Sequence, residues 1–406
     1  MHRELPEEFI TMMENLLHEE SKDFFEAMQE KPVVSVRLNK RKQIDLFPDN
    51  TPVPWCRSGV YLESRPEFIF DPLLHAGAYY VQDASSMIYE TVTELIIAQF
   101  LKEKGNNYYK VLDLCASPGG KTTAIINGLP DGCDVLANEY VKKRVEPLRQ
   151  NLDRWGYPSV KVANHDSSYY GGQAEEYDIV AVDAPCSGEG MMRKDDYALV
   201  QWSSTLVNQC SSLQKEILTN AVKALKPGGF LIYSTCTFNR MENEDNAEYI
   251  YSHLGLIPFD TDFPEEWGIM PGIDTSLPVY RFMPHKTKGE GLFLAIFRKP
   301  GEWKPSLKKE TTTAKTIKKK QGYKDTIPDI GEVLSVKKNL LPEIPRIELT
   351  LDQALAYLRR ESIPSPPESQ KGIVILTYKG LNLGLGKNIG SRINNLYPKE
   401  LRILKR

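Results

Sequence analysis

The feature that most constrains the fold is a regular alternation, between residues 108 and 300, of short apolar runs and longer amphipathic stretches. The runs have the length of β-strands. The stretches between them, such as Val141–Trp155 and Leu206–Leu225, have the length of crossover helices. This order predicts an α/β fold with a doubly wound parallel sheet. The predicted strands are Lys110–Leu114, Asp134–Ala137, Val160–Ala163, Asp178–Val182, Gly229–Tyr233 and Phe293–Phe297.

Further segments flank this part, as expected for a chain of 406 residues, which is too long for one ordinary core. The first hundred residues combine a helical pattern at Glu7–Leu17 with a strand-like run at Val33–Leu38. The last seventy combine a helical pattern at Leu349–Arg359 with a strand at Gly372–Tyr378 and a Gly-rich hairpin at 380–390. The predicted units are an amino-terminal α/β domain (1–105), a central domain (106–300), a basic linker rich in Lys and Thr (301–330) and a small β-rich module (331–406).

The net charge of −3 hides an asymmetry between the two ends of the chain. Residues 301–406 hold 21 Lys and Arg against 11 Asp and Glu, about +10, so the first 300 residues carry about −13. A basic tail behind an acidic body indicates a polyanionic partner. A solvated lysine-rich linker is the alternative explanation.

The chain has six cysteines and no C-x-x-C pair, so neither a zinc site nor a disulfide framework is expected, and we predict no metal. Free thiols without a signal-peptide pattern favour a reducing, cytoplasmic location. No apolar run is long enough to span a bilayer, so no membrane partner is predicted.

Two of the cysteines stand in similar contexts. Cys186 closes the run Asp183-Ala184-Pro185-Cys186, directly after one predicted strand, and Cys236 follows Ser234-Thr235 after another. Open α/β sheets bind ligands and perform chemistry at the carboxyl ends of their strands. We therefore expect the two thiols to lie near each other on that edge of the sheet.

A candidate cofactor loop, Val111–Thr123, runs from a strand into a helix through two glycines. It has neither the G-x-x-x-x-G-K nor the G-x-G-x-x-G spacing, which disfavours a phosphate site. Free N–H groups at a helix start suit a carboxylate, including the amino-acid end of S-adenosylmethionine. Glu139 and Asp166 end the next two strands, where acids can bind ribose hydroxyls and an adenine amino group; each alone could instead be a helix cap. The loop residues expected at the cofactor are Cys115, Ala116, Ser117, Pro118, Gly119, Gly120 and Lys121.

Several segments resemble the Sun (Fmu) family of RNA (cytosine-5) methyltransferases. The resemblance covers residues from about 30 to 300. Within that family, the tail is similar to the PUA-like RNA-binding module of the ribosomal RNA small subunit methyltransferase F group, in Leu383–Lys387 and Arg392–Pro398. The segments that carry the family resemblance are Asp113–Thr123, Asp183–Gly190, Tyr233–Thr237, Glu242-Asn243-Glu244 and Gly289-Glu290-Gly291.

The resemblance implies an S-adenosylmethionine-dependent enzyme that forms 5-methylcytosine through a covalent cysteine adduct, in RNA and more specifically in small-subunit ribosomal RNA. Cys236 would attack carbon 6 of the base, and Cys186 would assist product release. Asp183 would hydrogen-bond the base near the cofactor, and Lys121 would contact the substrate or Asp183. The target cytosine must be flipped out of its stack. RNA is thus the expected partner, DNA is not, and a monomer is the default.

Four alternatives remain open. Cys186 could be the nucleophile, as the Pro-Cys thiol is in DNA cytosine-5 methyltransferases. The fold could serve an amino-methyltransferase, although Asp-Ala-Pro-Cys lacks the aromatic residue that such enzymes place there. The substrate could be transfer RNA. The chain could also be a non-catalytic RNA-binding assembly factor.

Other polar and thiol residues invite weaker interpretations. Arg37, Asn39 and Gln82 match the family's amino-terminal pattern, and either contact with RNA or an ordinary structural role would explain them. Structural or incidental roles are expected for the remaining thiols and for two histidines: Cys56, Cys133, Cys210, His165 and His285.

Overall fold

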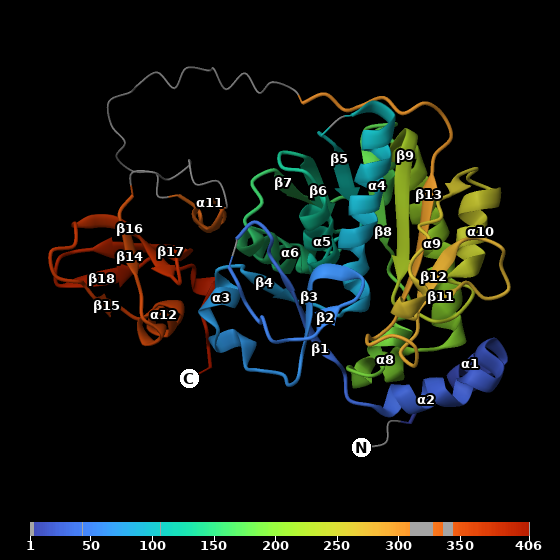
Figure 1. The fold of residues 1–406 in the computed structure, drawn as a ribbon, viewed down its shortest axis with the longest axis horizontal. Helices are drawn as coiled ribbons and strands as arrows, with labels where there is room; N and C mark the ends of the chain where they lie inside the picture. The colour runs from blue at the N-terminus through green and yellow to red at the C-terminus, as the bar shows by residue number, and fades with distance from the viewer. Residues whose placement is uncertain (1–3, 43, 106, 309–327, 336–343, 406) are drawn as a thin grey trace.

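A computed structural model of the chain describes residues 4–42, 44–105, 107–308, 328–335 and 344–405. Its central element is a nine-stranded sheet (Figure 1). All six predicted strands belong to it. The order is β11 (Met270–Pro271), β12 (Val279–Phe282), β13 (Leu292–Arg298), β9 (Leu225–Thr235), β8 (Tyr177–Asp183), β5 (Lys110–Asp113), β6 (Asp134–Asn138) and β7 (Val160–Ala163), with β10 (Ile257–Pro258) paired to β13.

The five strands from β9 to β7 are parallel, as predicted, but the prediction of a fully parallel sheet is wrong at its other side. β13 pairs antiparallel with β9, and β12 pairs antiparallel with β13. The chain enters β13 directly from its neighbour β12, without a crossover helix, so the strand runs in the opposite direction.

Alternate residues of the buried strands face two separate cores. Val111 and Ile179 pack on one face, and Leu112 and Val180 pack on the other. The first face is covered by α4 (Ile88–Lys104), α5 (Gly120–Gly128) and α6 (Lys142–Trp155). The second is covered by α7 (Ser167–Gly171), α9 (Ser204–Ala224) and α10 (Glu244–Ser252). The strand order reverses between β5 and β8, and ligands bind open α/β sheets at such a point.

The amino-terminal part has two pieces. α1 (Glu7–Leu17) and α2 (Ser21–Gln29) lie at the bottom of the view in Figure 1, where they pack with α8 (Asp196–Gln201) and the loop after β9. A four-stranded antiparallel sheet follows, and α3 (Pro72–His75) precedes its last strand. The sheet order is β2 (Pro52–Val53), β3 (Cys56–Leu62), β1 (Val34–Leu38) and β4 (Tyr79–Val81).

The carboxy-terminal module contains α11 (Ile330–Leu334), α12 (Leu351–Leu358) and a five-stranded sheet. The predicted Gly-rich hairpin joins β16 to β17, and a Cβ atom added at Gly384 would lie 2.3 Å from the Tyr357 hydroxyl. This close approach explains why glycine stands there. The sheet order is β14 (Arg346–Glu348), β16 (Gly372–Tyr378), β17 (Leu381–Asn388), β18 (Arg392–Asn395) and β15 (Ile363–Pro364).

The first residues of the predicted linker differ from expectation. Trp303 is 1% exposed and stacks on Phe100 of α4, with ring centroids 4.2 Å apart. Its indole N–H and the Ser306 hydroxyl both donate to Asp178. The segment up to Ser306 is therefore part of the central body, while residues 309–327 of the predicted linker lie outside the described part of the chain.

Lys42 ties the three parts of the molecule together. Its ammonium donates to the carbonyls of Ala76 (2.6 Å), Arg154 (3.2 Å) and Leu334 (2.9 Å), which lie at or near the carboxyl ends of α3, α6 and α11. Helix carbonyls that point outward favour a cation, but burial opposes the charge and lowers the pKa of Lys42 to about 7. Among the described helices, none has the length and apolar character needed to cross a membrane.

Candidate active site

The two thiols meet at the carboxyl ends of β8 and β9. These strands pair in parallel with Asp183 opposite Ser234, so the residues that follow them leave the sheet together. The Sγ atoms of Cys186 and Cys236 lie 3.3 Å apart, within hydrogen-bonding distance for two sulfurs. The structure thus brings together the pair that the sequence places at neighbouring strand ends.

Both thiols line a cavity of about 790 Å³ at this edge of the sheet. That volume lies within the range of roughly 300–1,000 Å³ that is typical of small-molecule sites. The cavity also collects acids from three strand ends, which the sequence predicts to act together. Its predicted lining residues are Cys115, Ser117, Glu139, Asp166, Asp183, Cys186 and Cys236.

Asp183 sits at the centre of a polar chain. One carboxylate oxygen accepts from Lys121 Nζ at 2.8 Å, and the other accepts from Ser234 Oγ at 2.8 Å. Ser234 Oγ is in turn 2.8 Å from the Tyr89 hydroxyl. Burial lowers the pKa of Lys121, but the carboxylate of Asp183 outweighs this effect and raises it. Of the two contacts that the sequence left open for Lys121, the structure contains the one with Asp183.

The environment makes the two thiols unequal. The hydrogen bond from Cys186 lowers the pKa of Cys236, and the Lys121 ammonium adds to this effect, against opposing contributions from burial and Asp183. The same hydrogen bond, burial and the carboxylate of Glu242 raise the pKa of Cys186. The Lys121 ammonium therefore favours the thiolate form of Cys236, and in that state Cys186 is the hydrogen-bond donor of the pair.

Two reciprocal hydrogen bonds fasten the cofactor loop to Arg144 of α6. The Ser117 hydroxyl donates to the Arg144 carbonyl at 2.9 Å, and Arg144 Nη2 returns a bond to the Ser117 carbonyl at 2.6 Å. Gly119 precedes α5 with φ of 106°, a conformation that favours glycine. Only part of the predicted loop reaches the cavity wall, through Cys115 and Ser117; the residues that do not line it are Ala116, Pro118, Gly119, Gly120 and Lys121.

Glu139 and Asp166 are both helix caps and cavity residues, so the two interpretations of these acids are compatible. Glu139 accepts from the Val141 N–H at 2.7 Å, just before α6. Asp166 accepts from the Ser168 N–H at 2.9 Å at the start of α7, and the hydrogen bonds of Ser168 lower the pKa of Asp166. Each carboxylate can accept more than one further donor. The acids, the loop and the cavity volume together fit a nucleoside cofactor.

Arg37, Asn39 and Gln82 have structural roles in this fold. The Arg37 guanidinium, fully buried, donates to Gln82 Oε1 at 2.8 Å and to the Thr123 carbonyl at 3.1 Å. The Asn39 amide donates to the carbonyls of Gly77 and Trp155. These contacts fasten the amino-terminal sheet to α5 and α6, and none of the three residues lines the cavity.

The histidines and remaining thiols also have definite places. His165 lines the cavity and stacks on Tyr169 with ring centroids 4.0 Å apart, which no sequence pattern indicated. His285 pairs with Glu20, and its burial lowers the pKa of the imidazole. Cys56 and Cys133 are buried, and Cys210 is half-buried on α9.

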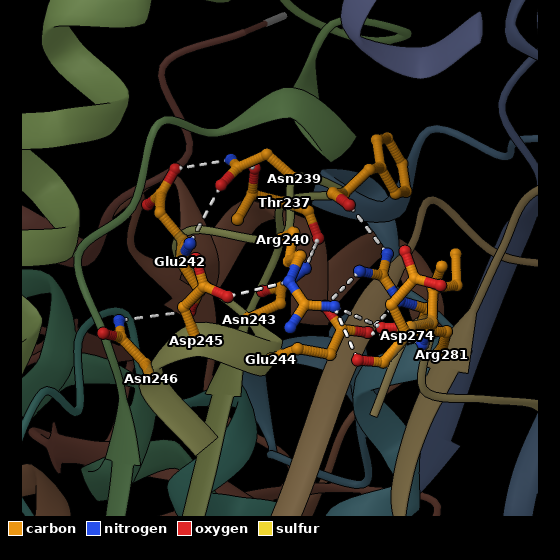
Figure 2. A network of polar contacts seen from close by, with 12 residues as sticks. Thr237, Asn239, Arg240, Glu242, Asn243, Glu244, Asp245, Asn246, Asp274 and Arg281 are labelled. Carbon is orange, nitrogen blue, oxygen red and sulfur yellow. Dashed lines mark hydrogen bonds and ion pairs between the residues drawn. The ribbon is translucent and has the colours of Figure 1, made fainter. Parts of the chain in front are cut away.

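A buried polar network behind the thiols was not predicted (Figure 2). It includes Glu242 and Asn239, with Asn239 Nδ2 donating to Glu242 Oε1 at 2.8 Å. Glu242-Asn243-Glu244 was noted only for its resemblance to the Sun family. Glu242 accepts from the backbone N–H of Ser187, next to Cys186, at 3.0 Å. Glu244 instead pairs with Arg281, whose Nε donates to it at 2.6 Å (Figure 2).

Three family models match the chain. Residues 98–298 match "16S rRNA methyltransferase RsmB/F", residues 5–84 match the amino-terminal domain of 16S rRNA methyltransferase RsmF, and residues 344–403 match the RsmF PUA domain. Together these models cover most of the chain, in the order of the three structural parts.

Similar proteins support the same assignment. Ribosomal RNA small subunit methyltransferase F from Cronobacter sakazakii is 30% identical over 98% of this chain and 96% of that protein. The protein of the same name from Vibrio campbellii is 29% identical over 98% of this chain and 97% of that protein. A methyltransferase homologue from Pyrococcus horikoshii superposes with a TM-score of 0.61 at 25% identity, over 72% of this chain and 95% of that one. The predicted family and fold class are confirmed: the chain belongs to the RsmB/F family of S-adenosylmethionine-dependent RNA methyltransferases, with a Rossmann-like catalytic domain between an RsmF-type amino-terminal domain and a PUA domain.

Proposed function

We propose that the protein methylates carbon 5 of a cytosine in small-subunit ribosomal RNA through a covalent adduct with Cys236. The observation that carries this proposal is the pair of thiols, 3.3 Å apart, at the wall of a cavity that also holds the acids of three strand ends. The relatives are named as ribosomal RNA small subunit methyltransferases, and this supports the choice of substrate.

Carbon 5 of cytosine is a weak nucleophile, and this explains the need for a thiolate. When Cys236 Sγ bonds to carbon 6, the electron pair of the 5,6 double bond becomes available at carbon 5 as an enamine. Bound S-adenosylmethionine supplies the electrophilic methyl group. A base must then take the carbon-5 proton, and the Sγ–C6 bond breaks to restore the ring. Cys186 assists this last step because its S–H can donate to the departing sulfur.

Four residues are proposed to hold the cofactor or the base. Glu139 and Asp166 both line the cavity; Glu139 would accept hydrogen bonds from the ribose hydroxyls, and Asp166 from the adenine amino group. Ser117 belongs to the loop that faces the amino-acid end. Asp183, held by Lys121 and Ser234, would bond the ring nitrogen and amino group of cytosine.

The remaining proposals concern the partner, the oligomeric state, the location and the domain limits. A cytosine can reach the cavity only when flipped out of its stack, so an unpaired target is proposed. RNA, not DNA, is the proposed partner because the relatives are named as ribosomal RNA methyltransferases. We further propose that the protein works as a monomer in the cytoplasm. The domain limits predicted from the sequence are 1–105, 106–300, 301–330 and 331–406. We propose them with two changes: the central domain extends to Ser306, and the carboxy-terminal module includes Ile330, where α11 begins.

Adduct trapping with RNA that contains 5-fluorocytidine tests the mechanism. With fluorine at carbon 5 there is no proton for a base to remove after methyl transfer, so the Cys236–cytosine adduct cannot break down. Wild-type protein and Cys186→Ala are expected to give a covalent complex on a denaturing gel, and Cys236→Ala none. Unmodified RNA is expected to accumulate the complex only with Cys186→Ala. Cys210→Ala is the matched control, since this half-buried thiol lies outside the cavity.

The opposite gel pattern would reverse the two thiol roles. Absence of any complex would favour an amino-methyltransferase, and absence of S-adenosylmethionine binding by titration calorimetry would favour a non-catalytic RNA-binding protein. Bisulfite sequencing of total RNA from cells with and without the gene identifies the modified cytosine. A signal in transfer RNA alone would replace the ribosomal substrate.

A further inference from the structure

Each thiol lies on a loop that is held by a carboxylate from the other loop. We define the first thiol loop as residues 184–190, which carry Cys186, and the second as residues 236–243, which carry Cys236. Glu189, on the first loop, accepts with one oxygen from the backbone N–H groups of Phe238 (2.6 Å) and Asn239 (2.9 Å) on the second. Glu242, on the second loop, accepts from the backbone N–H of Ser187 (3.0 Å) on the first.

Two amide side chains complete this reciprocal arrangement. Asn239 Nδ2 donates to Glu189 and to Glu242, at 2.8 Å in both cases (Figure 2 shows its bond to Glu242). Gln214 Nε2, from α9, donates to Glu242 at 2.7 Å and to the Pro185 carbonyl at 2.9 Å. The peptide groups on both sides of Cys186 are therefore linked to Glu242, one directly and one through Gln214.

The chemistry of these contacts requires carboxylates. Glu189 and Glu242 are fully buried, and among the described residues neither forms an ion pair. Burying a carboxylate without a cation is costly. Both oxygens of each residue, however, face N–H donors, including the Trp202 indole at Glu189. A glutamine would place its own donor against one of these donors, and only an acceptor-only group satisfies all of them.

We propose that Glu189 and Glu242 are positioning residues that set the separation and relative orientation of the two thiols. They touch neither thiol directly, and they act through the backbone that carries Cys186 and Cys236. Their importance for catalysis rests on the proposed function, whereas their effect on the thiol pair does not.

The test measures iodoacetamide alkylation of Cys236 against pH, by mass spectrometry of the modified peptide, with neither RNA nor cofactor present. The variants are Glu242→Gln and Glu189→Gln. Glu90→Gln is the control for loss of a buried carboxylate elsewhere in the molecule. Glu90 is 1% exposed and accepts hydrogen bonds from Ser58 and Asn127, although, unlike Glu189 and Glu242, it also pairs with Lys40.

The direction of the shift at position 242 separates positioning from charge. The carboxylate of Glu242 raises the pKa of Cys236, so loss of its charge alone would lower the alkylation midpoint. Loosening the hydrogen bond from Cys186 would raise it. We expect a rise of about one pH unit, the equivalent of about 1.4 kcal/mol, in both glutamine variants and none in the control.

Cross-linking of the pair provides a second readout of the same geometry. Diamide oxidises two neighbouring thiols to a disulfide, and the reagent takes up the two electrons and two protons. We expect Cys186–Cys236 disulfide to form at least about threefold more slowly in both glutamine variants. Unchanged or lowered midpoints with an unchanged disulfide rate, in variants that melt cooperatively by circular dichroism, would overturn the proposal.

Gln214→Met is the milder variant if the glutamine variants do not fold. It removes the bridge between Glu242 and the Pro185 carbonyl, and the same midpoint and disulfide criteria apply to it. Loss of RNA methylation with wild-type thiol behaviour would count against positioning, and altered thiol behaviour supports positioning whatever the RNA result. Only the absence of RNA methylation by the wild-type protein itself would count against the proposed function.

Discussion

Replacing Cys186 with alanine is expected to shift the pH profile of Cys236 alkylation to higher pH. The Cys186 thiol lies 3.3 Å from the Cys236 sulfur, and its hydrogen bond is the largest influence that lowers the pKa of Cys236. A hydrogen bond to a charged group contributes roughly 1.5–3 kcal/mol. At about 1.4 kcal/mol per pKa unit, the substitution should raise the pKa of Cys236 by about 1–2 units.

The rate of alkylation follows from two opposing effects. Below both pKa values the thiolate fraction falls about 10- to 100-fold, but a more basic thiolate is more nucleophilic, with a Brønsted coefficient of about 0.5. The net rate at Cys236 should therefore fall about 3- to 10-fold. Above both pKa values all of the sulfur is thiolate in either protein, and the variant should react about 3- to 10-fold faster. The two rate profiles should cross.

The assay is iodoacetamide labelling under pseudo-first-order conditions from mildly acidic to strongly alkaline pH, with the Cys236 peptide quantified by mass spectrometry. Cys186→Ser is the control, because its hydroxyl keeps a donor next to Cys236 and should give a smaller shift. Profiles that superimpose, or a lower midpoint in Cys186→Ala, would refute the reasoning that Cys186 maintains the Cys236 thiolate.

Three further predictions concern cofactor binding and stability. Burial raises the pKa of Asp113 from 3.8 to about 7. Between these two pH values the folded protein keeps the Asp113 proton that the unfolded chain releases, so the free energy of unfolding should fall as the pH rises from 3.8 to about 7. This dependence amounts to a change of up to about 4 kcal/mol in the free energy of unfolding, and Asp113→Asn should remove most of it. Denaturant melts over the same pH range measure the difference. Glu139→Gln should weaken S-adenosylmethionine binding about tenfold in titration calorimetry, because an amide is a poorer acceptor for the ribose hydroxyls than a carboxylate. Lys42→Met leaves the carbonyls of Ala76, Arg154 and Leu334 without their shared hydrogen-bond donor and should lower the free energy of unfolding by about 3 kcal/mol in urea.

The sequence predicts the strands of the sheet well because a strand that is buried on both faces consists of consecutive apolar residues. Val111 and Leu112 face different cores, and continuous apolar runs of this kind are typical of strands covered on both faces. The direction of a strand has no such signature. Phe293–Phe297 has the same apolar character as its parallel neighbours, and only its connection from β12 makes it antiparallel.

The candidate active site was also predictable only in part. The meeting of Cys186 and Cys236 could be predicted, because parallel strand ends share one edge of the sheet. Their unequal roles could be expected only from the family resemblance, because the physical cause of the inequality lies in side chains that are distant in sequence. Lys121 precedes its partner Asp183 by 62 residues, and Glu189 holds an N–H group 50 residues further on. Spacing within a motif carries no information about such contacts.

The inequality of the thiols has a consequence for the proposed mechanism. Two thiolates 3.3 Å apart would repel each other, so the pair holds at most one negative charge, and Lys121 favours placing it on Cys236. Once Cys236 is bonded to the base, its sulfur is no longer charged, and the main influence that raises the pKa of Cys186 disappears. Formation of the adduct would therefore make Cys186 more acidic, so that its S–H is a better proton donor to the Cys236 sulfur when the Sγ–C6 bond breaks. On this reasoning one thiol can protect the nucleophile before attack and promote its release afterwards, and no second conformation of the site is required.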